Sequence, residues 1–289
     1  MSRFVKSHAL GNDYIVVDSA DLEFPLTAEA VRRLCDRHFG VGSDGVLVRV
    51  PSRQADFGLR IYNPDGSEAE KSGNGLRIFA KYLYEHGHAR VPRFTVETLG
   101  GVVRCDLQVR DGRVVEVTVD MGEATFSSSR IPAAGPPREV VDEAVEVQGE
   151  VLRVTAVNVG NPHCVVFTED LGQVDLLRLG PALECHPLFP QRTNVQFAEV
   201  LAPDRVRIRI WERGAGHTLA SGSSACAVAA ACVRRGLTGR SLRVEMEGGT
   251  LRVSVEEGYR LRMTGPASEV YTGQLLPEFV ELLRSAGSP

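Results

Sequence analysis

The sequence lacks the marks of several large protein classes. None of its apolar runs approaches the ~20 residues that span a bilayer, and its start, Met1 to Lys6, has no apolar signal core. No block of Lys and Arg stands out and the formal charge is −4, whereas binding a phosphate backbone needs clustered positive charge. We therefore expect a cytoplasmic protein that has neither a membrane nor a nucleic acid as partner.

Cysteine pairing is missing as well. The six cysteines form no CxxC pair and no zinc-ligand spacing, so we expect reduced, mostly buried thiols and no metal. No linker rich in Pro, Gly and Ser divides the chain, and the Pro/Ala stretch 131–137 is typical of a loop. With 289 residues, 43% of them hydrophobic, the chain is long enough for two domains of ~100–200 residues, each with its own core.

What the sequence does contain is a duplication. Two turns rich in Gly and Ser each run straight into an apolar stretch, and they begin at Ser72 and Ser221, which are 149 residues apart (221 − 72). The same offset relates other landmarks: Gly11-Asn12 to Gly160-Asn161, Tyr62 to Trp211, and Gly87 to Gly236. A constant offset of this kind indicates two copies of one structural unit, and we expect a site between them.

Helix and strand signals follow the same order in both halves. Strand-like stretches alternate with helices, and the helix after Ser221 is apolar on nearly every face, which is typical of a buried helix. The pattern predicts an α+β fold of two pseudo-symmetric domains, each a curved, mostly antiparallel sheet wrapped around a central helix. The predicted domains are residues 1–117 and 118–273, with the C-terminal segment 274–289 as a candidate to pack back on the first.

The two helix starts suggest a chemistry. A helix N-terminus presents unpaired N–H groups and partial positive charge, and an adjacent glycine lets a ligand reach the backbone. Two such starts could grip one carboxylate from both sides, which would leave Ser72 and Ser221 flanking the next atom, the Cα of an amino acid. The alternative is plain N-capping of the helices by the two serines.

Five motifs in the chain resemble those of the diaminopimelate epimerase family. They are HALGND (8–13), NPDGSEAE (63–70), VDMGE (119–123), GNPHCV (160–165) and ERGAG (212–216). The resemblance covers nearly the whole chain in order. It implies two pseudo-symmetric α+β domains with the active site in the cleft between them, and an isomerase that uses neither pyridoxal phosphate nor a metal.

The resemblance also exposes a departure at the predicted catalytic positions. In the family a cysteine stands at each helix start; one thiolate removes the α-proton, and the other thiol delivers a proton to the opposite face. These positions fall on Ser72 and Ser221. A thiol titrates near ~8.5, whereas a serine hydroxyl is far less acidic and needs an adjacent base. The resemblance places His163 beside the first position and Glu212 beside the second, and both are candidates for acid/base groups. The alternative for His163 is a hydrogen-bonded core histidine.

The residues that the resemblance assigns to ligand binding are retained in this sequence. The resemblance assigns recognition of the far, non-reacting end of the substrate to Asn63, Asn161, Asn194 and Arg213. It assigns the near end to Asn12, Glu212 and the backbone at Gly73-Asn74 and Gly222-Ser223. An arginine can hold a carboxylate with two parallel hydrogen bonds, so the set implies a small ligand with two amino-acid ends.

Further departures surround the serines. Lys71, His217 and the pair Ser223-Ser224 also differ from the family pattern, which favours a natural Ser/Ser variant over an engineered one. His217 adds a titratable group, although a structural role is favoured for it.

Three functions follow from these observations. The first is a cofactor-independent isomerase that interconverts LL- and meso-2,6-diaminopimelate, for lysine and peptidoglycan synthesis, by two-base proton transfer at Cα. The second is another racemase, isomerase or dehydratase activity, with His163, Glu212 or His217 as base. The third is a non-catalytic binder of diaminopimelate-like ligands. The sequence leaves open whether the protein is a homodimer.

Overall fold

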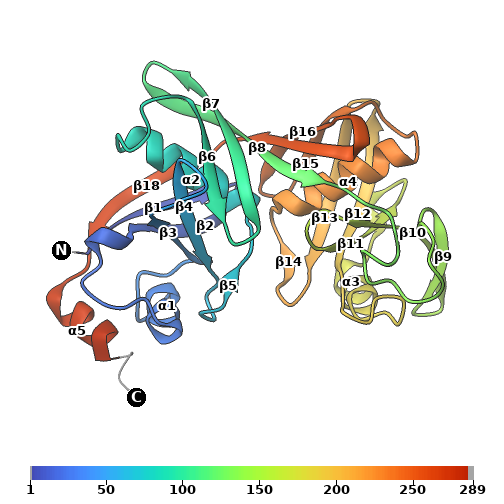
Figure 1. Cartoon of the computed structure of the whole chain (residues 1–289). Coiled ribbons are helices and arrows are strands. Elements are labelled where there is room, and N and C mark those ends of the chain that lie inside the picture. Colours follow the sequence, from blue (N-terminus) through green and yellow to red (C-terminus); the bar gives the residue numbers. More distant parts are fainter. Residues whose placement is uncertain (1, 286–289) are drawn as a thin grey trace. The chain divides into compact units, whose positions relative to one another are not determined.

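The computed structural model describes residues 2–285. They divide into two compact units (Figure 1): a first unit of residues 2–119 and 265–285, and a second unit of residues 120–264. The sequence placed the later boundary at 273/274, but the structure places it between Thr264 and Gly265. The reason is that strand β18 (Ser268–Gln274) pairs with β1 (Arg3–Ala9), so a segment from late in the chain completes the first unit.

The first unit is built on one sheet, with the strand order β18-β1-β2-β3-β4-β6-β7-β8. Neighbouring strands are antiparallel except for the parallel pairs β2–β3 and β4–β6, and β5 pairs only with β4, as a short arm. The strands not yet bounded are β2 (Asn12–Asp18), β3 (Val46–Val50), β4 (Phe57–Tyr62), β5 (Glu68–Ala69), β6 (Arg93–Thr98), β7 (Gly101–Arg110) and β8 (Arg113–Glu123).

The second unit repeats this sheet strand for strand, in the order β9-β10-β11-β12-β13-β15-β16-β17. The parallel pairs β11–β12 and β13–β15 occupy the matching places, and β14 is the arm on β13. The strands are β9 (Glu143–Val147), β10 (Glu150–Asn158), β11 (Pro162–Phe167), β12 (Asn194–Ala202), β13 (Arg205–Glu212), β14 (Gly216–Thr218), β15 (Ser241–Met246), β16 (Gly249–Val255) and β17 (Arg260–Gly265). The predicted α+β fold of two pseudo-symmetric halves is confirmed.

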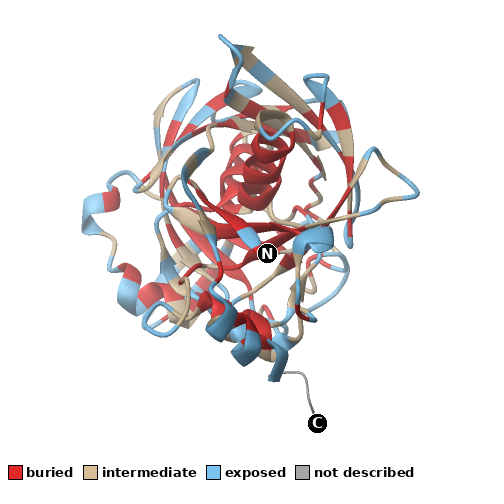
Figure 2. Ribbon diagram, turned by 90° about the vertical axis from the view of Figure 1, so that its left-hand side faces the viewer, coloured by how far each residue is buried: buried red, intermediate tan, exposed pale blue. Residues whose placement is uncertain are grey.

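Each sheet packs on one largely buried helix, and Figure 2 shows one such helix enclosed by strands. The helices α2 (Gly73–Glu85) and α4 (Gly222–Arg234) are 149 residues apart at both ends. Helix α4 is buried because its inner turns are almost all alanine, valine and cysteine. Helix α2 also buries Arg77 and Lys81; Arg77 donates to the Gly73 carbonyl and to Asn74 Oδ1, and Lys81 donates to Glu85 and to the Val114 carbonyl. Hydrogen bonding of this kind is what allows a charged side chain to be buried.

Shorter helices cover the outside of each unit. Helix α1 (Ala28–Cys35), capped by Thr27, and helix α5 (Pro277–Ser285) both belong to the first unit, where Val280 and Leu283 of α5 enter the same core cluster as Val31 of α1. Helix α3 (Leu176–Glu184) covers the second sheet. The single-turn 3-10 helices are η1 (Ser19–Asp21), η2 (Leu171–Gln173) and η3 (Glu257–Tyr259). Among residues 2–285, no helix is long and apolar enough to cross a membrane.

All six cysteines are free; five are buried and Cys185 is exposed. The burial agrees with the expectation of mostly buried thiols.

Candidate active site

The serines at the two helix starts have nearly the same geometry. Ser72 precedes α2 with φ −137° and ψ 118°, and its Oγ accepts the Gly75 N–H at 3.0 Å. Ser221 precedes α4 with φ −142° and ψ 124°, and its Oγ accepts the Ser224 N–H at 3.4 Å. Both serines therefore do cap their helices, as the alternative interpretation proposed. Capping uses a lone pair of the hydroxyl and leaves its proton available, so a cap can also act in chemistry.

In the first unit, a chain of amides and charges leads away from the start of α2. Asn74 Nδ2 donates to Asn12 Oδ1 at 3.0 Å, and Asn12 Nδ2 donates to Asp44 Oδ2 at 3.0 Å. Arg77 Nη2 donates to Asn74 Oδ1 at 2.9 Å from the other side. Two of the predicted binding residues, Asn12 and Asn74, are thus brought together and held in fixed orientations.

The far end of this chain is an ion-pair cluster. Arg37 Nη2 lies 2.7 Å from Asp44 Oδ1 and 2.8 Å from Asp13 Oδ1, and Lys6 also pairs with Asp13. Burial by itself would raise the pKa of Asp13, but hydrogen bonds from Arg37 and Lys6 outweigh it and lower this pKa to about 2. Asp13 therefore stays charged at neutral pH, and the cluster holds Asn12 through Asp44.

Asn63 lies in the turn that follows β4. Its Nδ2 donates to Ser67 Oγ at 3.0 Å, and its backbone N–H donates to the Ser67 carbonyl. The turn is closed by Gly66, whose φ of +85° favours glycine. The turn thus fixes the backbone and the side-chain amide of Asn63 directly after strand β4.

In the second unit, His163 is a core residue. It is 0% exposed, and its Nε2 lies 2.9 Å from Asn161 Oδ1. Burial lowers the pKa of His163 to about 3; an interaction with the Gln196 side chain acts in the opposite direction, and the charge of Arg213 lowers the pKa further. The imidazole is therefore neutral at physiological pH. Among the described residues, no hydrogen bond joins it to either serine.

Next to His163, the buried side chain of Gln196 leads to the start of α4. Gln196 lies beside the imidazole, and its Nε2 donates to Ser224 Oγ at 2.9 Å. The backbone N–H of Ser224 is the group that caps onto Ser221. His163 is thus a core histidine whose Nε2 meets Asn161 Oδ1, whereas its Nδ1 and the Oε1 of Gln196 have no hydrogen-bond partner among the described residues.

Arg213 follows β13 in a loop that several groups hold in place. Asn194 Oδ1 accepts the Arg213 backbone N–H at 2.9 Å, and Asn194 Nδ2 donates to the Pro162 carbonyl at 2.9 Å. The guanidinium of Arg213 is also held, because its Nη1 donates to the Gln191 carbonyl at 3.2 Å. Two predicted binding residues, Asn194 and Arg213, are therefore in direct contact.

Sequence reasoning missed Glu184, which anchors the same loop. This carboxylate is only 6% exposed; its Oε2 accepts the Trp211 indole N–H at 2.7 Å and its Oε1 accepts the Gly214 N–H at 3.0 Å. Glu184 ends helix α3, outside every recognised motif. No sequence signal distinguishes it from an ordinary surface glutamate.

The remaining predicted residues lie at the end of β13, in β14 and in the first turn of each central helix. Glu212 Oε2 accepts from Thr218 Oγ1 at 3.1 Å, and Ser221 Oγ lies 3.3 Å from Ser223 Oγ. Gly222, like Gly73 in the first unit, is the first residue of its helix. His217 pairs with Glu247, at 3.0 Å, which fits the structural role favoured for it.

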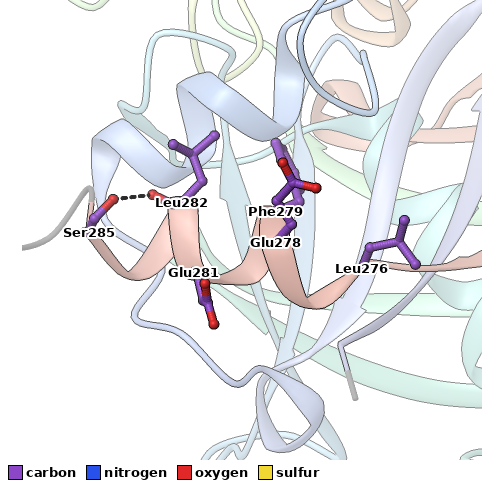
Figure 3. Close-up of a pocket in the computed structure, with 6 residues that line it drawn as sticks. All are labelled: Leu276, Glu278, Phe279, Glu281, Leu282 and Ser285. Atoms are coloured by element: carbon purple, nitrogen blue, oxygen red, sulfur yellow. Dashed lines mark hydrogen bonds between the residues drawn. The ribbon is translucent and has the colours of Figure 1, made fainter.

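A hollow of about 570 Å³ lies on helix α5 (Figure 3). It is lined by Leu276 and residues of α5, and by none of the predicted site residues. The predicted chemistry is therefore unrelated to it.

Comparison with known proteins first defines the class to which the fold belongs. The structure of a probable proline racemase from Agrobacterium radiobacter K84 superimposes with a TM-score of 0.72, covering 97% of this chain and 96% of that one at 19% identity. A hydroxyproline epimerase from Agrobacterium vitis superimposes with a TM-score of 0.70, covering 95% and 90% at 18% identity. The fold is thus the one found in these amino-acid racemases and epimerases.

Sequence comparison then gives the family. The diaminopimelate epimerase family model matches residues 4–127 and 155–270. The diaminopimelate epimerase of Pelotomaculum thermopropionicum is 49% identical over 276 residues, covering 94% of this chain and 98% of the relative. That of Heliobacterium modesticaldum is 46% identical over 280 residues, covering 94% and 99%. The chain belongs to the diaminopimelate epimerase family, and the resemblance seen in its motifs is confirmed.

Proposed function

We propose that this protein is a cofactor-independent epimerase that interconverts LL- and meso-2,6-diaminopimelate. The observation that carries the proposal is the matched pair of helix starts, each with a serine cap and a glycine at the first helical position. The names of the relatives, at 42–49% identity over more than nine-tenths of the chain, support the same substrate.

The helix starts supply the electrostatics of the reaction. Removing the α-proton of an amino acid places negative charge on Cα and on the neighbouring carboxylate. Backbone N–H groups at Gly73 and Gly222 are suited to bind that carboxylate. Donors that are already oriented toward developing charge lower the barrier without reorganising.

Ser72 and Ser221 are the proposed acid and base, one for each face of Cα. Each Oγ already accepts a backbone N–H at a helix N-terminus, which stabilises negative charge on the oxygen. Because a hydroxyl is less acidic than a thiol, we expect slower turnover than thiols would give at these positions. Glu212, at the end of β13, is the proposed acid/base group beside Ser221. His163, held neutral by burial, is proposed to orient Asn161.

The distal end of the substrate is assigned to Asn63, Asn161, Asn194 and Arg213. The Arg213 loop is fixed by Asn194 and Glu184, so its guanidinium can meet a carboxylate at little entropic cost. Asn12 and Asn74, locked to each other, are proposed to serve the reacting end.

The proposal is tested by proton NMR of LL-diaminopimelate with the protein in heavy water. The expected result is loss of the α-proton signal and appearance of the meso isomer, abolished by Ser72→Ala or Ser221→Ala and retained by Ser129→Ala, an exposed serine far from both helix starts in sequence. Binding of the substrate without α-proton exchange would instead indicate a non-catalytic binder. Exchange with a different amino acid would indicate another racemase.

We also propose that the protein works in the cytoplasm. An exposed free thiol at Cys185 is in keeping with a reducing compartment. Recovery of the protein in the membrane or secreted fraction of its host would contradict this.

A further inference from the structure

The hydroxyl of Ser72 has a second neighbour that its proposed role does not yet use. Tyr14 Oη lies 3.2 Å from Ser72 Oγ, within hydrogen-bond distance. Tyr14 belongs to β2 and is 7% exposed. Ser72 Oγ therefore accepts the Gly75 N–H on one side and meets a phenol on another.

The tyrosine ring is held closely in this position. A Cβ added at Gly45 would lie 2.8 Å from Tyr14 Cε1 and 3.2 Å from Cδ1, which real Cβ atoms do not tolerate without a shift. On the other side, the backbone of Tyr14 pairs with Ser7 of β1. The phenol has little freedom to move away from Ser72.

The charged side chains around strand β2 form ion pairs and hydrogen bonds with other groups. Lys6, Asp13, Arg37 and Asp44 form the ion-pair cluster described above. Asp13 is next to Tyr14 in β2, so strand alternation points its side chain to the opposite face of the sheet. Arg77 is bonded within α2 to Gly73 and Asn74. Two groups lie within hydrogen-bond distance of Ser72 Oγ, the Gly75 N–H and the Tyr14 hydroxyl, and of these the Tyr14 hydroxyl is the titratable one.

The repeat shows that this contact is not demanded by the fold. The residue 149 positions after Tyr14 is His163 (163 − 14), and its Nε2 is turned to Asn161. The side-chain neighbour of Ser221 Oγ is Ser223, at 3.3 Å. The two helix starts keep the same cap but have different side chains on the hydroxyl, and within residues 2–285 the phenol contact is found at Ser72 and not at Ser221.

A serine needs such a neighbour more than a cysteine does. A thiol with a pKa near ~8.5 reaches its anionic form without help at neutral pH, whereas a hydroxyl needs a partner that orients it and exchanges a proton with it. A phenol can do both, because its O–H donates and its oxygen accepts. An ordinary phenol also titrates near ~10, between the thiol and the hydroxyl.

We propose that Tyr14 is the positioning residue of Ser72, which orients its hydroxyl and exchanges a proton with it during turnover. When Ser72 delivers its proton to Cα, the phenol proton of Tyr14 moves to Ser72 Oγ, so a C–H bond forms with the electron pair of the substrate and Tyr14 is left as the phenolate. In the opposite direction the phenolate takes the proton of Ser72 while Ser72 takes the proton of Cα, and the electron pair stays on the substrate, delocalised into its carboxylate. This inference rests on the proposed epimerase function, and the first test below is independent of turnover.

The first test measures acidity directly. In a Ser72→Cys variant, the pKa of the new thiol is read from the pH dependence of its alkylation by iodoacetamide, followed by the mass of the peptide, so that the exposed Cys185 does not interfere. Adding Tyr14→Phe should raise that pKa by about one unit, because a donor to the thiolate is lost. Tyr82→Phe, which changes a buried tyrosine on α2 itself, should leave it unchanged. A thiol pKa that is the same with and without the Tyr14 hydroxyl would overturn the proposal.

The second test uses turnover of diaminopimelate. Tyr14→Phe in the natural Ser72 background should lower kcat at least tenfold with KM changed less than twofold, since the substrate cradle is untouched. In the Ser72→Cys background the same change should cost far less, because a thiolate forms without the relay. Equal losses in both backgrounds, or a loss confined to KM, would mean that Tyr14 only shapes the pocket. If the natural protein exchanges no α-proton while the thiol pKa shifts, the proposed substrate fails and the control of position 72 by Tyr14 stands.

Discussion

Replacing Glu184 by glutamine tests whether a residue outside every motif controls the substrate loop. The natural carboxylate accepts two donors, the Trp211 indole N–H at 2.7 Å and the Gly214 N–H at 3.0 Å, and Arg192 Nη1 lies 3.6 Å away. An amide keeps one acceptor oxygen but turns an NH₂ group toward the other donor. The result is one lost charge-assisted hydrogen bond and one poorly satisfied buried donor, together about 2–3 kcal/mol.

The expected effect has two parts. Urea unfolding should show a loss of about 2–3 kcal/mol for Glu184→Gln, whereas Glu281→Gln on exposed helix α5 should stay within ~0.5 kcal/mol. Because the loop carries Arg213, the KM for diaminopimelate should rise several-fold while kcat falls less. A Glu184→Gln variant with unchanged stability and unchanged KM would refute the argument that this carboxylate holds the loop.

Three further predictions follow from the same geometry. Gly45→Ala should cost about 1–3 kcal/mol and reduce kcat, because the added Cβ would lie 2.4 Å from the Tyr62 carbonyl oxygen and 2.8 Å from Tyr14 Cε1, so that both the backbone and the Tyr14 ring must shift. Gly239→Ala, whose added Cβ meets nothing closer than 3.7 Å, should be nearly neutral in the same unfolding and activity measurements. Ser221→Ala should abolish α-proton exchange but cost only about 0.5 kcal/mol in stability, because its capping bond is long at 3.4 Å. His163 has a pKa of about 3 when folded and near ~6.5 when unfolded, so the unfolded state binds the extra proton between these values. Stability should therefore fall with decreasing pH by up to about 1.4 kcal/mol per pH unit, and a His163→Gln variant should lack this contribution in urea titrations from pH 7 to 5.

The repeat made much of the fold predictable from the sequence. A hydrophobic pattern that recurs at a constant offset fixes both the position of each central helix and the order of the surrounding strands, since each copy confirms the other. The position of β18 was the exception. In the second unit the strand next to β10 is β9, which is reached by a tight hairpin. In the first unit the matching place beside β1 is filled from the far end of the chain, and long-range pairing leaves no local signal.

The site divides in the same way. Motifs identified which residues gather at the helix starts, because a Gly/Ser-rich turn before an apolar helix is a local signal. They could not give the environment of each residue. His163 lies in a motif that suggests catalysis, yet its burial holds it neutral and its ring nitrogen serves Asn161. Glu184 lies in no motif, and its importance comes entirely from two donors that the fold brings to it.

The duplication also separates what the fold requires from what the chemistry requires. The two central helices begin and end at equivalent positions of the repeat. Each is preceded by a serine in an extended conformation, whose oxygen accepts a backbone N–H of the first turn. These shared features are the ones that the scaffold requires. The side chains that touch the two hydroxyls differ, a phenol at Ser72 and a second serine at Ser221. A contact that only the fold needed would be expected in both copies. The difference therefore places Tyr14 with the chemistry, and removing one oxygen atom from its ring is the smallest change that can show it.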